Sequence, residues 1–253
     1  MIAELGLSAG TLALIALSFF AGAFIKGALG FGMPLLTMAI IPLVAPVGLA
    51  LALNAVIAFI LNAAQTAEAG PRLGREAALR FWPVLAMLGP GVALGAALVS
   101  VVDEATLRLV LGATVLGFVG LSVSGAALSI PPERERAAGI ATGAVAGVVG
   151  GLTTANGPIL LMYLVGLNLD RPMFRVALGL LFLATALFAG IGFLAVGVLD
   201  GPRAVLALIC LPPSILGTWA GMRLGRRLPQ KTFQAAVMAG LAAIGANYVL
   251  QTL

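Results

Sequence analysis

The chain has 253 residues, of which 61% are hydrophobic and only 9% are charged, and its mean hydropathy is +1.15. A soluble domain of this length does not need so much apolar sequence, so the composition indicates an all-α integral membrane protein. The chain has no histidine and a single cysteine, Cys210. A transition-metal site is therefore disfavoured, and an intramolecular disulfide is excluded. The basic residues that give the net charge of +5 are scattered over short loops. This pattern is typical of loops between membrane spans and not of nucleic-acid binding.

The first apolar segment, 5–47, is interrupted at 25–36 by the sequence IKGALGFGMPLL. This stretch places Lys26, three glycines and Pro34 inside an otherwise uncharged run. Proline is favoured at the first position of a helix, so a new helix is expected to begin near Pro34. We therefore predict two helices joined by a break.

Six later runs are long enough to cross a bilayer once, which takes roughly 20 helical residues: 48–67, 81–102, 109–130, 176–199, 204–222 and 232–253. The run 137–169 differs from them. It has 33 residues, too long for one span and too short for two, and it is broken at GGLTTANGPILL. Its anatomy is that of the first segment, with a long apolar arm, a glycine-rich break and a proline.

The two broken segments align with each other. A shift of 124 positions places Gly151 on Gly27 and Pro158 on Pro34, and the second spans, 81–102 and 204–222, align at a shift of 122, with GPGVALGAAL facing LPPSILGTWA. The sequence therefore predicts two repeats of one broken segment and three spans each. The predicted first repeat, charged linker and second repeat are 1–128, 129–136 and 137–253.

The basic residues decide between two topologies. If each broken segment crosses the membrane once, the basic loop residues divide six against seven and give no orientation. If each segment enters and leaves on one side, they divide eleven against two, as the positive-inside rule requires. We therefore predict a multi-pass cell-membrane protein with six spans, two re-entrant hairpins and non-cytoplasmic termini. Three crossings per half make the repeats inverted, so the hairpin tips could meet near the midplane. A full crossing by the first segment remains open.

The breaks are suited to anions, because a helix N-terminus exposes unpaired N–H groups and the positive end of the helix dipole. A lysine inside the membrane needs a partner or a cavity, and no apolar run contains Asp or Glu. An anionic substrate is the simplest partner for Lys26, and snorkelling to the headgroups is the alternative. Asn54 could instead join helices, and Arg175 could be an ordinary positive-inside residue. The candidate substrate-binding residues are Lys26, Gly30, Phe31, Gly32, Met33, Asn54, Thr153, Thr154, Asn156, Gly157 and Arg175.

The two breaks resemble a known family, the TauE/SafE permeases, also called the toluene sulfonate uptake permease family. The similar stretches are GALGFGMPLL, GGLTTANGPILLMYLVGLNLDRPMFRVALGLLFL, LGAAL and MRLGRRLPQKTFQAAV, so the resemblance covers nearly the whole chain. It implies transport, often export, of sulfur-containing anions such as sulfite, sulfoacetate or other organosulfonates. Phe31 and Met33 stand where that family commonly has glycine, so a narrower or more apolar pocket is expected.

The sequence thus predicts a secondary transporter that works by alternating access around the two breaks, without a cofactor. No paired carboxylates or nucleophile and base lie in the membrane runs, so an enzyme is disfavoured. An anion channel and a transporter of other carboxylate or inorganic anions are the alternatives. The expected partners are a small anion and the lipid bilayer. The sequence leaves open a coupled proton or sodium ion and a homodimer.

Overall fold

The structure is a computed structural model that describes most of the chain: residues 5–124, 129–224, 239, 242–243, 246–247 and 250. Every regular element in these residues is helical, and no strand occurs among them. Six of the described helices are long and apolar enough to cross a membrane. The predicted class, an all-helical membrane protein, is therefore confirmed.

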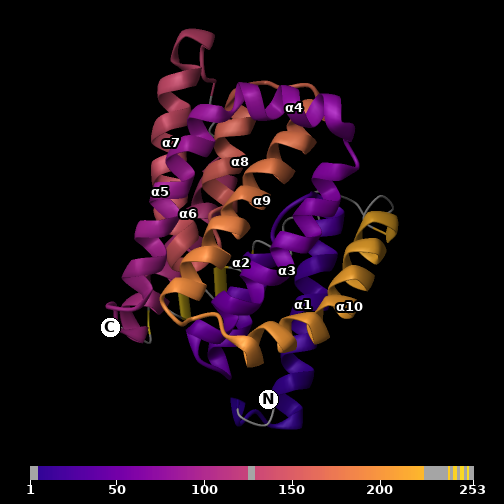
Figure 1. The fold of residues 1–253 in the computed structure, drawn as a ribbon, viewed down its shortest axis with the longest axis vertical. Helices are drawn as coiled ribbons and strands as arrows, with labels where there is room; N and C mark the ends of the chain where they lie inside the picture. The colour runs from indigo at the N-terminus through magenta and orange to yellow at the C-terminus, as the bar shows by residue number, and fades with distance from the viewer. Residues whose placement is uncertain are drawn as a thin grey trace. The chain divides into compact units, whose positions relative to one another are not determined.

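Figure 1 labels the helices in chain order, and α1, α3, α5, α7, α9 and α10 are the six candidate spans. The predicted spans 48–67, 81–102, 176–199 and 204–222 correspond to four of them, and the arms of the broken segments are the other two. The predicted last span, 232–253, falls mostly outside the described residues. The helices are α1 Ala9–Leu29, α2 Met33–Ile40, the 3-10 turn η2 Ile41–Leu43, α3 Val47–Ala67, α4 Gly70–Arg80, α5 Trp82–Val99, α6 Glu104–Ser124, α7 Pro132–Thr153, α8 Gly157–Gly166, α9 Arg171–Ala195 and α10 Gly201–Leu224.

Two helices begin earlier than the hydropathy pattern predicts. Part of the predicted linker 129–136 is helical, because α7 begins at Pro132. The first turn of α7 carries Glu133, whose negative charge interacts favourably with the helix dipole. The span predicted at 109–130 begins at Glu104, and the Asp103 side chain caps it. Charged residues can extend a helix beyond the bilayer, so hydropathy finds the apolar part of a helix and not its end.

The sequence analysis assigned no helix to 70–80, where the structure has α4. This helix is polar along one side, with Arg72, Arg75 and Glu76 exposed and Ala77 buried. It packs against α9 and α5. A polar helix lying across the end of a bundle leaves no apolar run of membrane length, so a search for spans does not detect it.

The described chain forms two compact units, each containing helices from both halves of the sequence. Unit 1 comprises Met1–Ile57, Val102–Gly125 and Val198–Leu253, and unit 2 comprises Ala58–Val101 and Ala126–Gly197. In unit 1, α1 packs along α10 and α2 packs against α1. In unit 2, α5 packs along α7, while α8 and α9 pack against α7 and against each other.

In unit 2, glycines bring the backbones of α5 and α7 into direct contact. A methyl group at any of them would collide with a carbonyl oxygen of the facing helix, at 2.8 Å for Gly91. Such close approach is typical of helix pairs in membranes, where small residues permit dispersion contacts between backbones. The glycines and the carbonyls that they contact are Gly91 with Ala144, Gly95 with Val148, and Gly151 with Val92.

The same three contacts recur between α1 and α10 in unit 1. They are Gly217 with the carbonyl of Phe20, Gly221 with that of Phe24, and Gly27 with that of Thr218. Each contact maps onto its counterpart in unit 2 when the broken segments are shifted by 124 positions and the second spans, α5 and α10, by 126. The shift for the second spans thus differs from the 122 used in the sequence alignment. That alignment paired Gly95 with Gly217, whereas the contacts pair Gly91 with Gly217 and Gly95 with Gly221.

Candidate functional site

The second break separates α7 from α8 in unit 2. Helix α7 ends at Thr153, and α8 begins at Gly157 with Pro158 in its first turn. Helix α8 then runs back along α7, so that the Tyr163 hydroxyl donates a 3.3 Å hydrogen bond to the Glu135 carbonyl. The break therefore forms the tip of a hairpin.

The two ends of this hairpin lie together. The N–H of Ile130, which precedes α7, donates a 2.8 Å hydrogen bond to the carbonyl of Gly166, the last residue of α8. The chain thus enters and leaves the hairpin at the same end of unit 2. This is the geometry that the charge partition requires of the second broken segment.

The tip of this hairpin is polar and buried. Thr153 is fully buried, and its hydroxyl accepts a 3.1 Å hydrogen bond from the N–H of Ala155. Asn156 is 1% exposed, and its side-chain nitrogen donates to the Ala146 carbonyl at 3.0 Å and to the Thr185 hydroxyl at 3.1 Å. Both amide hydrogens of Asn156 are therefore engaged within the protein. Thr185 was missed in the sequence analysis, because nothing local marks it as the partner of a residue 29 positions away.

Thr154 adopts an uncommon backbone conformation between these residues. Its φ is 54°, in the left-handed region, and it caps the end of α7. A β-branched residue is strained there, and such strain persists mainly at functional sites. This backbone strain is an argument for keeping Thr154 among the candidate site residues.

The first break separates α1 from α2 in unit 1 and is built on glycine. Gly30 has φ 87° and donates a 2.6 Å hydrogen bond to the Lys26 carbonyl, which ends α1. Gly32 has φ 106° and precedes α2, in whose first turn Pro34 lies. Glycine alone adopts such angles readily, so these two residues determine where the chain turns.

Helix α2 also runs back along its partner arm. A Cβ on Gly22 of α1 would lie 2.9 Å from the Met33 carbonyl and 3.3 Å from the side chain of Thr37. Met33 is fully buried in this contact region. Met33, which the sequence analysis expected to make the pocket more apolar, therefore packs α2 against α1.

Lys26 lies in the last turn of α1, next to the first break. It is 5% exposed, so its side chain is almost completely enclosed. A cation is favoured by the dipole at the C-terminal end of a helix. The other charged residues of the six candidate spans lie near the ends of their apolar runs. Lys26 instead lies well inside the apolar run 9–43.

Asn54 belongs to a buried contact between α2 and α3. Its side-chain oxygen accepts a 2.8 Å hydrogen bond from the Thr37 hydroxyl, and its nitrogen donates to the Ala50 carbonyl at 2.9 Å. Both Asn54 and Thr37 are fully buried. The structure thus gives Asn54 the helix-joining contact that the sequence left as an alternative, and it identifies Thr37 as a partner that sequence analysis missed.

The helix N-termini at the two breaks lack side-chain caps. The helices α1, α6, α9 and α10 each begin with a side chain that accepts a hydrogen bond from the first turn, namely Ser8, Asp103, Asp170 and Asp200. No side chain does this for α2 or α8. Helices α4, α5 and α7 also lack caps, but they begin at the charged end of unit 2 described below. At the two breaks, the helix ends without side-chain caps lie beside the apolar arms α1 and α7.

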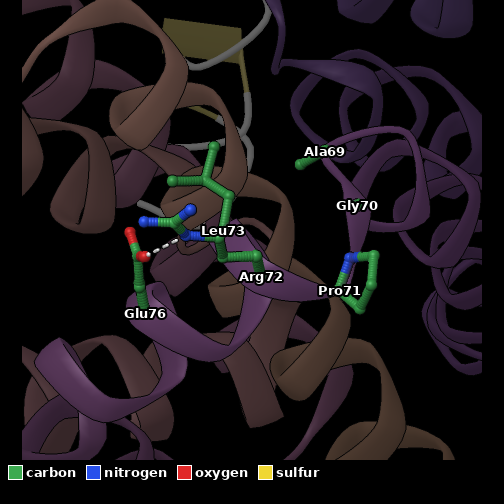
Figure 2. A pocket seen from close by; sticks show the side chains of 6 residues that line it. All are labelled: Ala69, Gly70, Pro71, Arg72, Leu73 and Glu76. Carbon is green, nitrogen blue, oxygen red and sulfur yellow. Dashed lines mark hydrogen bonds and ion pairs between the residues drawn. The ribbon is translucent and has the colours of Figure 1, made fainter.

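Arg175 is not brought to the second break. It lies in the first helical turns of α9, ten residues before Thr185 and therefore roughly 15 Å away along the helix. It lines a cavity of about 390 Å³ together with Arg171 and Glu68. A second cavity, of about 460 Å³, lies at the start of α4. Arg72 and Glu76, two of its lining residues, form a 3.2 Å ion pair (Figure 2). Neither cavity includes a residue of the breaks.

The two cavities belong to the charged end of unit 2. Arg80 forms a two-pronged ion pair with Glu135, at 2.8 and 3.0 Å, which joins the end of α4 to the start of α7. The hydrogen bond from Arg80 to Glu135 raises the pKa of the arginine further above its ordinary value. Every charged residue in the described part of unit 2 lies at this end: Glu68, Arg72, Arg75, Glu76, Arg80, Glu133, Arg134, Glu135, Arg136, Asp170, Arg171 and Arg175.

Comparisons with known proteins agree with this anatomy. Residues 14–248 match the family model described as sulfite exporter TauE/SafE. The chain is similar to a protein of Cupriavidus necator named probable sulfite/organosulfonate exporter TauE, with 27% identity over 241 residues, 91% of this chain and 90% of that protein. No solved structure shows a significant match. Because the family model covers most of its length, the chain belongs to the TauE/SafE family of membrane transporters.

Proposed function

We propose that the protein is a secondary transporter, working as an exporter, of sulfur-containing anions such as sulfite, sulfoacetate or other organosulfonates. Each break offers the N-terminus of a short helix to the anion, α2 in unit 1 and α8 in unit 2, and alternating access takes place around the breaks. The observation that carries the proposal is the absence of a side-chain cap on both short helices, together with a buried lysine beside the first break. Uncapped N–H groups and the helix dipole attract anions at such positions.

Lys26 supplies the positive charge in this mechanism. A lysine in the hydrocarbon region costs roughly 2.5–3.5 kcal/mol on insertion scales, so it is retained where it serves a function. Gly30 and Gly32, which flank Phe31, let the backbone approach a ligand that binds next to Lys26. Phe31, between the two glycines, narrows the approach, which favours a small anion such as sulfite over bulkier sulfonates.

The matched glycine contacts support two inverted repeats. In each unit, the long arm of one broken segment packs on the second span of the other half of the sequence. The three contacts agree at constant shifts, which chance similarity among glycine-rich helices does not explain. Inverted repeats with broken helices are typical of secondary transporters, and they place substrate at the breaks.

A flux measurement tests the proposal. The purified protein is reconstituted in liposomes that are loaded with sulfite, and the exit of sulfite is followed with and without the same anion outside. Sulfoacetate and acetate serve as the larger and the carboxylate analogues. We expect sulfite flux that saturates and that external sulfite accelerates by exchange, with empty liposomes as the control. Flux no greater than in empty liposomes for any of the three anions would refute the proposal.

The same vesicles separate a transporter from a channel. A channel would give linear, voltage-driven anion currents without exchange, because its pore is open to both sides at once. A transporter limited by a conformational change gives far smaller currents and shows exchange. Repeating the flux with imposed proton or sodium gradients then identifies the coupling ion.

A further inference from the structure

The cavity of about 390 Å³ at the charged end of unit 2 lies between the end of α3, the start of α4 and the start of α9. Its volume falls in the range of about 300–1,000 Å³ that is typical of small-molecule sites. The lining is mixed: Glu68, Arg171 and Arg175 are charged, whereas Leu73 and Val176 are apolar. No residue of the breaks lines this cavity, so the proposed transport function does not account for it.

The cavity lies at the level of the lipid headgroups. Helix α3 contains no charged residue before Glu68, and α9 contains none after Arg175. These two candidate spans therefore both change from apolar to charged at the cavity, as spans do at the surface of a bilayer. One turn farther along α9, Gly179 packs so closely on α3 that an added Cβ would lie 3.0 Å from the Thr66 hydroxyl oxygen. This contact closes the cavity on the side of the membrane interior.

Opposite charges share the cavity without forming a pair. Arg171 and Arg175 are four residues apart on α9, so both lie on one side of the helix. These two arginines and Glu68 are exposed. Within the part of the chain that the structure describes, none of the three forms an ion pair. Asp170, the other acid at the start of α9, is engaged in capping that helix. The cavity therefore presents two positive charges and one negative charge to a ligand.

A phosphate group suits a pair of arginines, because guanidinium groups donate paired hydrogen bonds to its oxygens. Basic pockets between membrane helices bind lipid headgroups in this way. The Glu68 carboxylate repels a headgroup with a net negative charge but attracts an ammonium group. We propose that the cavity binds a phospholipid whose headgroup carries both groups, as phosphatidylethanolamine does: Arg171 and Arg175 bind the phosphate, and Glu68 binds the primary ammonium.

Such a lipid links α3 to α9 at the membrane surface. It adds to the 3.4 Å hydrogen bond from the Gln65 side chain to the Arg175 carbonyl, which joins the same two helices. A ligand that binds only the folded protein stabilises it, so phosphatidylethanolamine should raise the Tm of the protein in detergent.

Native mass spectrometry of the whole protein in detergent, with one lipid added at a time, measures the dissociation constant of each lipid. Phosphatidylglycerol has the phosphate but no ammonium, and phosphatidylcholine has an ammonium without hydrogens to donate. We expect the wild type to bind phosphatidylethanolamine at least about fivefold more tightly than either of them, the effect of one hydrogen bond between charged groups.

Two variants test the two halves of the site. Arg171→Gln/Arg175→Gln should weaken the binding of phosphatidylethanolamine at least about tenfold, because it removes the charged donors to the phosphate. The matched control is Arg75→Gln/Arg134→Gln, which removes the same charge from exposed arginines of unit 2 that do not line the cavity. Glu68→Gln should abolish the preference for phosphatidylethanolamine over phosphatidylglycerol. All five residues are exposed, so each variant should keep the wild-type Tm without added lipid.

Three results would overturn the inference. The first is equal binding of phosphatidylethanolamine by Arg171→Gln/Arg175→Gln and its control. The second is equal binding of the three lipids by the wild type, or a preference for phosphatidylethanolamine that persists in Glu68→Gln. The third is full displacement of the lipid by an equal concentration of glycerophosphoethanolamine, which would assign the cavity to a soluble ligand. None of these measurements involves sulfite, so they leave the proposed function untouched.

Discussion

The two breaks have the same plan but different chemistry. Each joins a long apolar helix to a short helix that begins with a proline, has no side-chain cap and runs back along the long one. The first break turns on Gly30 and Gly32 and has a buried lysine beside it. The second turns on Thr154 and is surrounded by hydroxyl and amide groups, with no charged residue in the tip.

This difference suggests a division of labour. A cation compensates the charge of an anion but does not select its shape, whereas oriented hydrogen-bonding groups depend strongly on geometry. We therefore expect the first break to determine whether an anion binds at all and the second to determine which anion binds best. Five substitutions, in four experiments, test this comparison.

The largest effect is expected at Lys26. Lys26→Met removes the charge and keeps the length of the side chain, so sulfite flux should fall at least about thirtyfold, as when one partner of a buried charge pair is lost. The flux of sulfite from liposomes measures this effect, and Arg108→Gln is the control, because Arg108 is half-buried near the start of α6 in the same unit and pairs with Glu104. Wild-type flux in Lys26→Met would remove Lys26 from the site.

Alanine at Gly32 and at Gly157 compares the backbones of the two breaks. Gly32→Ala places a Cβ at φ 106° and 2.9 Å from the side chain of Ile25, and the left-handed conformation alone costs roughly 1–2 kcal/mol of stability. Gly157 has no positive φ, and its Cβ would meet Phe182 at an ordinary 3.4 Å, so Gly157→Ala should change the stability by less than about 1 kcal/mol. Thermal unfolding in detergent measures both. Equal losses of Tm would contradict the difference between the breaks.

Thr154→Gly makes the second break resemble the first. Relief of the left-handed strain, worth roughly 1–2 kcal/mol, exceeds the entropic cost of glycine, roughly 0.5–1 kcal/mol. The variant should therefore be more stable than the wild type by about 0.5–1 kcal/mol while its sulfite flux falls, since the Thr154 hydroxyl is lost from the site. A stabilised variant with full flux would show that the strain at Thr154 serves no transport function.

The smallest effect is expected at Arg175. It lies roughly 15 Å along α9 from the residue that contacts the second break, beyond the screening length of about 8 Å at physiological salt. Arg175→Gln should lower sulfite flux no more than about threefold at low salt and leave it unchanged at high salt, as for a residue that only attracts anions. A salt-independent loss of the size expected for Lys26→Met would instead place Arg175 in the binding site.

Local signals predicted the breaks closely. Gly30, Gly32 and Pro34 in one segment and Pro158 in the other mark the ends of helices, because glycine and proline restrict the backbone wherever they occur. The helical class and the four described spans followed from the length of apolar runs, which the thickness of a bilayer sets. Helix α4 and the start of α7 were missed, since both are charged and lie outside such runs.

The contacts between elements depended on tertiary structure. Nothing local to Asn54 or Asn156 indicates Thr37 or Thr185 as a partner, because a hydrogen bond between helices depends on how they are packed and rotated. The same holds for the pairing of α1 with α10 and of α5 with α7, which glycines permit but do not specify.

The sequence by itself thus determined the apolar helices, the two breaks and the lysine beside one of them, because length, hydropathy, glycine and proline act within a few residues. Only the tertiary structure decided that the Asn156 amide turns away from α8 and that Arg175 lies far from the break. Both outcomes depend on residues of α7 and α9 that are distant in sequence, and their positions follow from packing.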